Sequence, residues 1–146
     1  MANIDSHSTS NVNDCKIITL KRVALPEAGN YSAVQNTPPL PFNVRRIFYL
    51  YDLPADAERG GHSHHVEQEL IVAVAGSFDV TVDDGKQRRT FHLDRPYHAL
   101  HVTAGIWRTI GNFSSGSVCL VLSSTTFDEA DYVRDYDVFT QLTASK

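Results

Sequence analysis

Short apolar runs separated by turn residues recur along this chain of 146 residues, which is the rhythm of an all-β protein. Some runs alternate strictly with polar residues, as in FDVTV at 78–82, while ELIVAVA at 69–75 is continuously apolar after Glu69 and indicates a buried strand. The sequence Asp83-Asp84-Gly85 between two such runs is a strong hairpin signal. Strands are therefore predicted at 17–25, 44–51, 69–75, 78–82, 88–93, 99–102, 107–110 and 117–123.

The two ends of the chain differ from this middle. Residues 1–14 are rich in Asn, Ser and Asp and are predicted to be a disordered tail, with a single domain over 15–146. At the other end, Tyr132, Tyr136 and Phe139 are spaced i, i+4, i+7, which predicts one helix over 128–139. Many strands with one terminal helix and no strand–helix alternation favour a closed barrel or jelly roll.

Composition excludes several classes of function. The net charge of −4 gives no general attraction to nucleic acid or to anionic membranes. No apolar run approaches the roughly 20 residues needed to cross a bilayer, and the first 14 residues lack a secretory signal. Cys15 and Cys119 lie far apart without metal-type spacing, so a disulfide scaffold is not expected. These features predict a cytoplasmic protein.

Candidate chemistry concentrates in a histidine cluster. Three of the seven histidines fall within the four residues 62–65, directly after Gly60 and Gly61. In a strand, His62 and His64 point to the same face because side chains alternate with period two. Neutral imidazole also titrates near 6.5, which suits it to proton transfer near neutral pH.

The spacing of this cluster matches the first sequence motif of the cupin superfamily. His62-x-His64 is followed by Glu69 after four residues and by Gly76 after six more. The resemblance implies a small cupin jelly-roll β-barrel, here with a short C-terminal helix. Two histidines with a carboxylate are also a known iron-binding set.

The second cupin motif supports the fold but speaks against a metal. Gly105 and Asn112 fall in register with it, but Arg108 occupies the position of the last metal-ligating histidine. A guanidinium has no lone pair to offer and repels a dication. Three interpretations remain open: a metal-free acid–base site, a metal site, and a merely polar strand. The first is preferred, with no cofactor.

Beyond the general cupin pattern, the region 41–139 resembles the nucleotide-sugar 3,4-ketoisomerases, the small cupins similar to the C-terminal part of WxcM-like proteins. The similarity is carried by six stretches: PFNVRRIFYLYDLP (41–54), RGGHSHH (59–65), AGSFDVTVDDG (75–85), LDRPYHAL (93–100), GIWRTIGNFSSGSVCLVLSS (105–124) and FDEADYVRDYDVF (127–139).

This resemblance implies a metal-free isomerase of deoxysugar biosynthesis, supplying a sugar for lipopolysaccharide or S-layer glycan. The substrate would be dTDP-4-oxo-6-deoxyglucose, whose keto group moves from C4 to C3 through an enediol. The resemblance assigns His62 as the acid–base at carbon and His64 as its partner at the oxygens. It also implies a homodimer with exchanged N-terminal strands.

The substrate would need further contacts. Arg46, Arg59 and Arg108 are the candidates for the diphosphate, since a guanidinium forms paired charge-assisted bonds to phosphate. Candidates to line the sugar or stack on thymine are Tyr49, Tyr97 and Trp107, although aromatic residues are more often core.

Departures from the family keep other functions in view. An arginine usual near the N-terminus is missing, and Glu69 stands where glutamine is common. The alternatives are a cupin epimerase, a non-catalytic sugar-nucleotide-binding cupin and a metal-dependent oxygenase.

Overall fold

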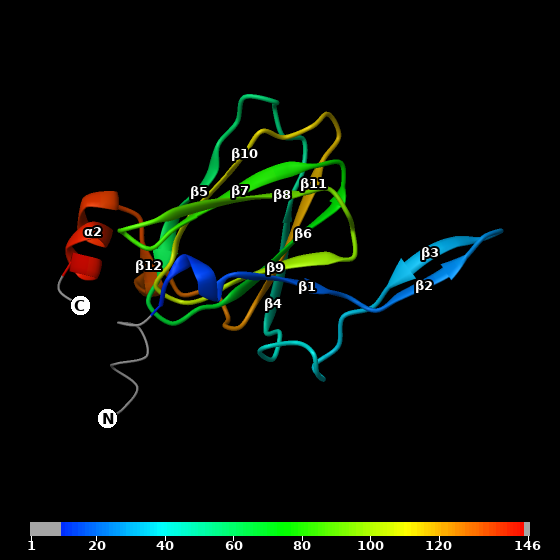
Figure 1. Cartoon of the computed structure of the whole chain (residues 1–146), viewed down its shortest axis with the longest axis horizontal. Helices are drawn as coiled ribbons and strands as arrows, with labels where there is room; N and C mark the ends of the chain where they lie inside the picture. Colours follow the sequence, from blue (N-terminus) through cyan, green and yellow to red (C-terminus); the bar gives the residue numbers. More distant parts are fainter. Residues whose placement is uncertain (1–9, 145–146) are drawn as a thin grey trace.

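A computed structural model describes residues 10–144, and its body is two five-stranded antiparallel sheets that face each other (Figure 1). The first sheet has the order β1 (Lys16–Thr19), β9 (His98–Val102), β6 (Glu69–Ala75), β11 (Val118–Ser123), β4 (Arg46–Leu50). The second has the order β12 (Tyr132–Val133), β5 (Arg59–His64), β10 (Trp107–Gly111), β7 (Phe78–Asp83), β8 (Arg88–Leu93).

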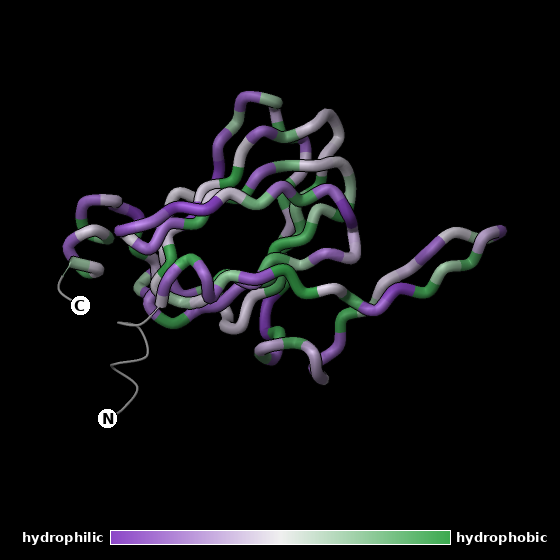
Figure 2. Tube along the Cα trace, in the orientation of Figure 1, coloured by the Kyte–Doolittle hydropathy of each residue, from purple (hydrophilic) through white to green (hydrophobic). Residues whose placement is uncertain are grey.

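The core lies between the sheets because alternate side chains of each strand point inward. Val80 and Val82 of β7 are fully buried, as are Ile71 of β6 and Leu100 of β9. The apolar strand β6 is covered on both faces over residues 70–73, and its trace is mostly green in Figure 2. The predicted all-β jelly roll is confirmed, although its hydrogen bonds form two sheets rather than one closed barrel.

A separate hairpin, which follows β1 and precedes β4 in the sequence, extends from the body of the fold. It consists of β2 (Arg22–Leu25) and β3 (Gly29–Ser32), and it projects away from both sheets (Figure 1). The positive φ of 91° at Gly29 suits the tight turn that joins the two strands.

The N-terminal region joins the fold earlier than predicted. The predicted tail lies outside the described residues over 1–9, but 12–14 form a 3-10 turn, η1 (Val12–Asp14). Val12 is buried, and its N–H donates to Asp84 Oδ2 over 3.0 Å. The same Asp84 shapes the β7–β8 turn, so η1 is fastened to the predicted hairpin.

The predicted helix over 128–139 is wrong over residues 128–135. The chain there forms η2 (Glu129–Asp131) and β12, and only then α2 (Tyr136–Ala144). The Asp131 carboxylate accepts the backbone N–H groups of Val66 and Glu67, over 2.8 and 3.0 Å. These bonds hold the segment against β5, where Tyr132 pairs with His64 as a strand. No helix within 10–144 is long and apolar enough to cross a lipid bilayer.

Candidate active site

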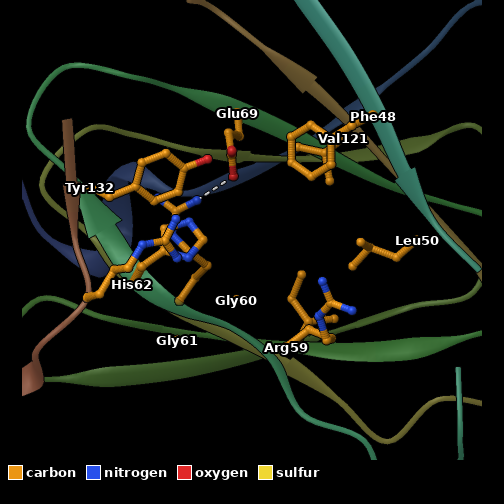
Figure 3. A pocket seen from close by; sticks show the side chains of 12 residues that line it. Phe48, Leu50, Arg59, Gly60, Gly61, His62, Glu69, Val121 and Tyr132 are labelled. Atoms are coloured by element: carbon orange, nitrogen blue, oxygen red, sulfur yellow. Dashed lines mark hydrogen bonds and ion pairs between the residues drawn. The ribbon is translucent and has the colours of Figure 1, made fainter. Parts of the chain in front are cut away.

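A cavity of about 280 Å³, here called the central cavity, opens between the two sheets on the side of β5 (Figure 3). Both sheets supply its walls, one with apolar side chains and the other with glycines, a histidine and arginines. The lining residues are Phe48, Leu50, Arg59, Gly60, Gly61, His62, Glu69, Arg108, Ile110, Val121, Tyr132 and Arg134.

His62 is the titratable imidazole of this cavity. Gly60 takes a φ of 82°, which favours glycine, and so brings β5 past the cavity before His62. The Nε2 atom of His62 is buried and has no hydrogen-bond partner. Burial, and then the charge of Arg108, lower the pKa of His62 to about 3. The ring is therefore neutral at neutral pH and able to accept a proton.

His64 lies behind His62 on the same side of β5, as the alternation predicted. The two ring centroids are 4.7 Å apart. His64 is buried and does not line the central cavity. Its Nδ1 lies 3.1 Å from Asp131 Oδ2, so Nδ1–H donates to that carboxylate. Burial, and then Arg108, lower the pKa of His64 to about 2.

Two of the three predicted phosphate-binding arginines are occupied by buried carboxyl groups. Arg108 is 1% exposed, and its Nη1 donates to Glu69 Oε1 over 2.5 Å. Arg46 lies just outside the cavity lining, where Nη1 and Nη2 donate to the two oxygens of Glu67 over 3.3 and 3.4 Å. Both guanidinium groups are thus held by carboxyl groups inside the protein.

Arg59 and Arg134 differ, because their heads are at the mouth of the cavity. Arg59, the third predicted arginine, is exposed at the start of β5 (Figure 3). Arg134 follows β12 and stacks over the ring of Tyr132, 4.1 Å from its centroid. Arg134 also pairs with Glu129 over 2.7 Å at the surface.

Tyr132 is a cavity residue that the sequence analysis assigned to a helix face. Its ring lies 4.9 Å from that of His62 and 4.3 Å from that of His64. Its hydroxyl oxygen accepts a hydrogen bond from Arg46 Nη2 over 3.4 Å. Burial, and then the charge of Glu67, raise the pKa of Tyr132. The aspartates around it, DEADY, were the available signal, since Asx-type bonds favour turns over helix.

The three predicted aromatic contacts do not reach the central cavity in this chain. Tyr49 is 60% exposed, because β4 directs odd-numbered side chains outward. Tyr97 packs outside the first sheet, beneath Arg22 at 4.2 Å. Trp107 lies behind Gly61, in edge-to-face contact with Tyr136 at 5.1 Å. Trp107 therefore supports β5 from its outer face.

The residues at the histidines do not fit a metal ion well. Donor atoms of His62, His64 and Glu69 lie within 4.8 Å of one another. However, Arg108 holds one oxygen of Glu69 and places a fixed positive charge beside the set. A dication would have to bind against that charge.

The geometry agrees with what sequence comparison finds. The family described as FdtA, WxcM-like, C-terminal, matches residues 13–144. The chain belongs to this family. The TDP-4-oxo-6-deoxy-alpha-D-glucose-3,4-oxoisomerase of Aneurinibacillus thermoaerophilus is 34% identical over 124 residues, covering 85% of this chain and 88% of that protein. The predicted family and the predicted isomerase class are thereby confirmed.

Solved structures of 3,4-ketoisomerases superpose closely on this fold. A 3,4-ketoisomerase from Helicobacter canadensis is 33% identical, with a TM-score of 0.86 over 90% of this chain and 98% of that one. The 3,4-ketoisomerase from Thermoanaerobacterium thermosaccharolyticum is 25% identical, with a TM-score of 0.89 over 93% and 98%. That second structure is a histidine-to-asparagine variant in complex with TDP-4-keto-6-deoxyglucose.

Proposed function

We propose that this protein is a dTDP-4-oxo-6-deoxyhexose 3,4-ketoisomerase whose proton transfers at carbon are made by His62. The observation that carries the proposal is His62 itself, a neutral imidazole with an unpartnered Nε2 at the wall of a cavity. The similarity to ketoisomerases over most of the chain supports the substrate class.

The reaction is an internal redistribution of protons and needs no oxidant. His62 Nε2 takes the proton from C3, the C3–C4 double bond forms, and the C4 carbonyl oxygen becomes an enediolate oxygen. That oxygen gains a proton while the C3 hydroxyl loses one. His62 then returns its proton to C4, which leaves the carbonyl at C3. One histidine serves both carbons because they are neighbours on the ring.

The oxygens need a second group that donates and accepts protons. The resemblance to the family implies His64 for this task, but His64 is buried behind His62 and does not line the cavity. Tyr132 does line it, and because its oxygen accepts from Arg46, its O–H proton is free for a sugar oxygen. We assign the oxygen protons to Tyr132 and the support of His62 to His64.

The diphosphate is assigned to the two arginines at the cavity mouth. Arg46 and Arg108 are hydrogen-bonded to the buried Glu67 and Glu69, so neither guanidinium group is available to a ligand. Arg59 and Arg134 lie at the opening, where a nucleotide attached to the sugar would emerge. The ion pair of Arg134 with Glu129 is at the surface, where solvent screens it, so Arg134 can exchange this partner for a phosphate.

The functional unit is proposed to be a homodimer in which the β2–β3 hairpin packs on a second copy. An isolated two-stranded hairpin is only marginally stable in water. The hairpin also exposes Leu25 and Tyr31, and the edge strand β4 exposes Ile47 and Tyr49. A second copy would bury such apolar groups and pair the free edge of β4.

One experiment separates the candidate reactions. The protein is incubated with dTDP-4-oxo-6-deoxyglucose in deuterated water and followed by NMR. The expected result is a 3-oxo product that carries deuterium at C4 to the extent that the proton on His62 exchanges with solvent, together with exchange at C3 of the remaining substrate. Exchange at C5 instead would indicate the epimerase, and tight binding without exchange would indicate a non-catalytic binder; either result refutes the ketoisomerase.

A matched pair of variants tests the role of His62 as the base. His62→Asn keeps polarity but removes the base, and turnover should fall by about 10²- to 10⁴-fold. His65→Asn alters the exposed histidine directly after the same strand and should retain wild-type turnover. Equal rates for the two variants would exclude His62 as the base.

A further inference from the structure

Two buried carboxyl groups, Glu67 and Glu69, lie side by side beneath the histidines. Their side chains are 1% and 4% exposed. Both direct an oxygen at the same atom, Nε2 of His64, over 3.5 and 3.6 Å. Burial of two carboxylates in contact is costly unless one of them is protonated.

The hydrogen bonds distinguish the two groups. Glu67 accepts hydrogen bonds from both terminal nitrogens of Arg46 and from the hydroxyl of Thr125, the last over 2.9 Å. Glu69 accepts a hydrogen bond from Arg108 on Oε1 only, and its buried Oε2 has no hydrogen-bond partner. The protein therefore stabilises Glu67 as an anion by hydrogen bonds, whereas Glu69 has one oxygen to which no group donates.

His64 has the complementary deficiency. Because Nδ1–H donates to Asp131, the neutral ring carries a lone pair on Nε2. That Nε2 is also buried without a hydrogen-bond partner. Two acceptor atoms that face each other in the interior repel, unless a proton lies between them.

We propose that Glu67 and Glu69 share a single proton, carried on Oε2 of Glu69, and that this proton holds His64 neutral in its Nδ1–H form behind His62. The catalytic consequence rests on the proposed function, but the protonation itself does not. Glu69 is then a positioning residue: it fixes the tautomer of His64, and the His64 ring in turn supports the ring of His62.

The electrostatics agree in direction. Burial, opposed by Arg108 and reinforced by Glu67, raises the pKa of Glu69 to about 8. For Glu67, burial is outweighed by hydrogen bonds from Glu69 and Thr125, so its pKa is lowered. The charged or titratable groups that face the pair come from six elements: Arg46 (β4), His62 and His64 (β5), Arg108 (β10), Cys119 (β11), Asp131 (η2) and Tyr132 (β12).

The proton should be visible directly by infrared difference spectroscopy of the full chain labelled with ¹³C-glutamate. Between about pH 6.5 and about pH 9.5, one label-sensitive carbonyl band of a protonated carboxyl should disappear, with a midpoint near 8. The band should be absent in Glu69→Gln and present in Glu58→Gln, a control at an exposed glutamate. Absence of the band in the wild type at the lower pH would overturn the proposal, whether or not the protein is a ketoisomerase.

Activity gives a second readout. Glu69→Gln keeps a donor at this position and cannot ionise, so turnover at neutral pH should stay within about threefold of wild type. The wild type should lose activity as the pH rises through about 8, and Glu69→Gln should not. Glu69→Leu removes the donor and should lose activity at all pH values. A folded Glu69→Gln with little activity at neutral pH would mean that Glu69 works as an anion.

Discussion

The ring of His64 meets that of His62 edge to face, at an interplanar angle of 88°, yet only His62 borders the central cavity. The two histidines are therefore not equivalent. His62 faces the space where a sugar would bind, while His64 faces Asp131 and the two buried glutamates. Mutation of either would damage the site, but for different reasons.

The hydroxyl of Tyr132 provides the first test of this division. Tyr132→Phe keeps the ring against both histidines and removes only the proton donor to the sugar oxygens. We expect kcat to fall by about 10²-fold with little change in KM. Tyr136→Phe is the matched control, because Tyr136 donates to Asp83 outside the cavity over 2.7 Å. A Tyr132→Phe enzyme with wild-type kcat would show that a group other than Tyr132 transfers the protons at the sugar oxygens.

The arginines at the cavity mouth should affect binding rather than chemistry. Arg59→Gln and Arg134→Gln are each expected to raise KM about tenfold at constant kcat, since the diphosphate is bound alike in ground and transition states. Added salt should raise KM of the wild type more than that of the variants. Arg95→Gln, at an exposed arginine beside Asp94, is the control. If KM is unchanged in both variants, the diphosphate binds elsewhere.

Acid should destabilise the protein through its buried imidazoles. The pKa values of His62 and His64 are lowered to about 3 and about 2, so the unfolded chain binds protons that the folded chain does not. Stability is present above the unfolded value of about 6.5 and falls below it by about 1.4 kcal/mol per pH unit for each histidine.

The measurement is a comparison of denaturant unfolding curves at several pH values between about 7 and about 4. Glu69 contributes with the opposite sign over part of this range, because its pKa is raised, but it does so equally in wild type and variant. His62→Asn should therefore lose stability less steeply on acidification than the wild type. A parallel decline in both would show that His62 titrates in the folded protein as it does in the unfolded chain.

The position of Arg108 predicts that the enzyme works without a bound transition metal. Within residues 10–144, one cluster of possible metal-ligating atoms includes His62, and it consists of His62, His64 and Glu69. The bond of Arg108 to Glu69 places a guanidinium group beside this cluster. Metal analysis of purified protein should find no stoichiometric transition metal, and a chelator should leave turnover unchanged. A stoichiometric metal that is lost together with activity would contradict this.

Much of the framework was determined by sequence alone. The apolar run at 69–75 placed β6 at its observed bounds, and turn chemistry located the Asp83–Gly85 turn. Period-two alternation put His62 and His64 on one face. The resemblance in 41–139 identified the family that the comparisons then confirmed. These are local properties, because strand propensity, turn chemistry and motif spacing depend on neighbouring residues.

Tertiary structure decided which of these side chains are available. The sequence predicts Arg46 and Arg108 as phosphate ligands, but in the fold both are hydrogen-bonded to glutamates distant in the sequence. Tyr132 read as part of a helix, yet Asp131 binds the backbone after β5 and turns Tyr132 into the cavity. Side-chain pairing across 20 to 70 residues leaves no periodic signal, because it depends on how the two sheets pack. That packing is why the fold could be predicted while the chemical roles of individual residues could not.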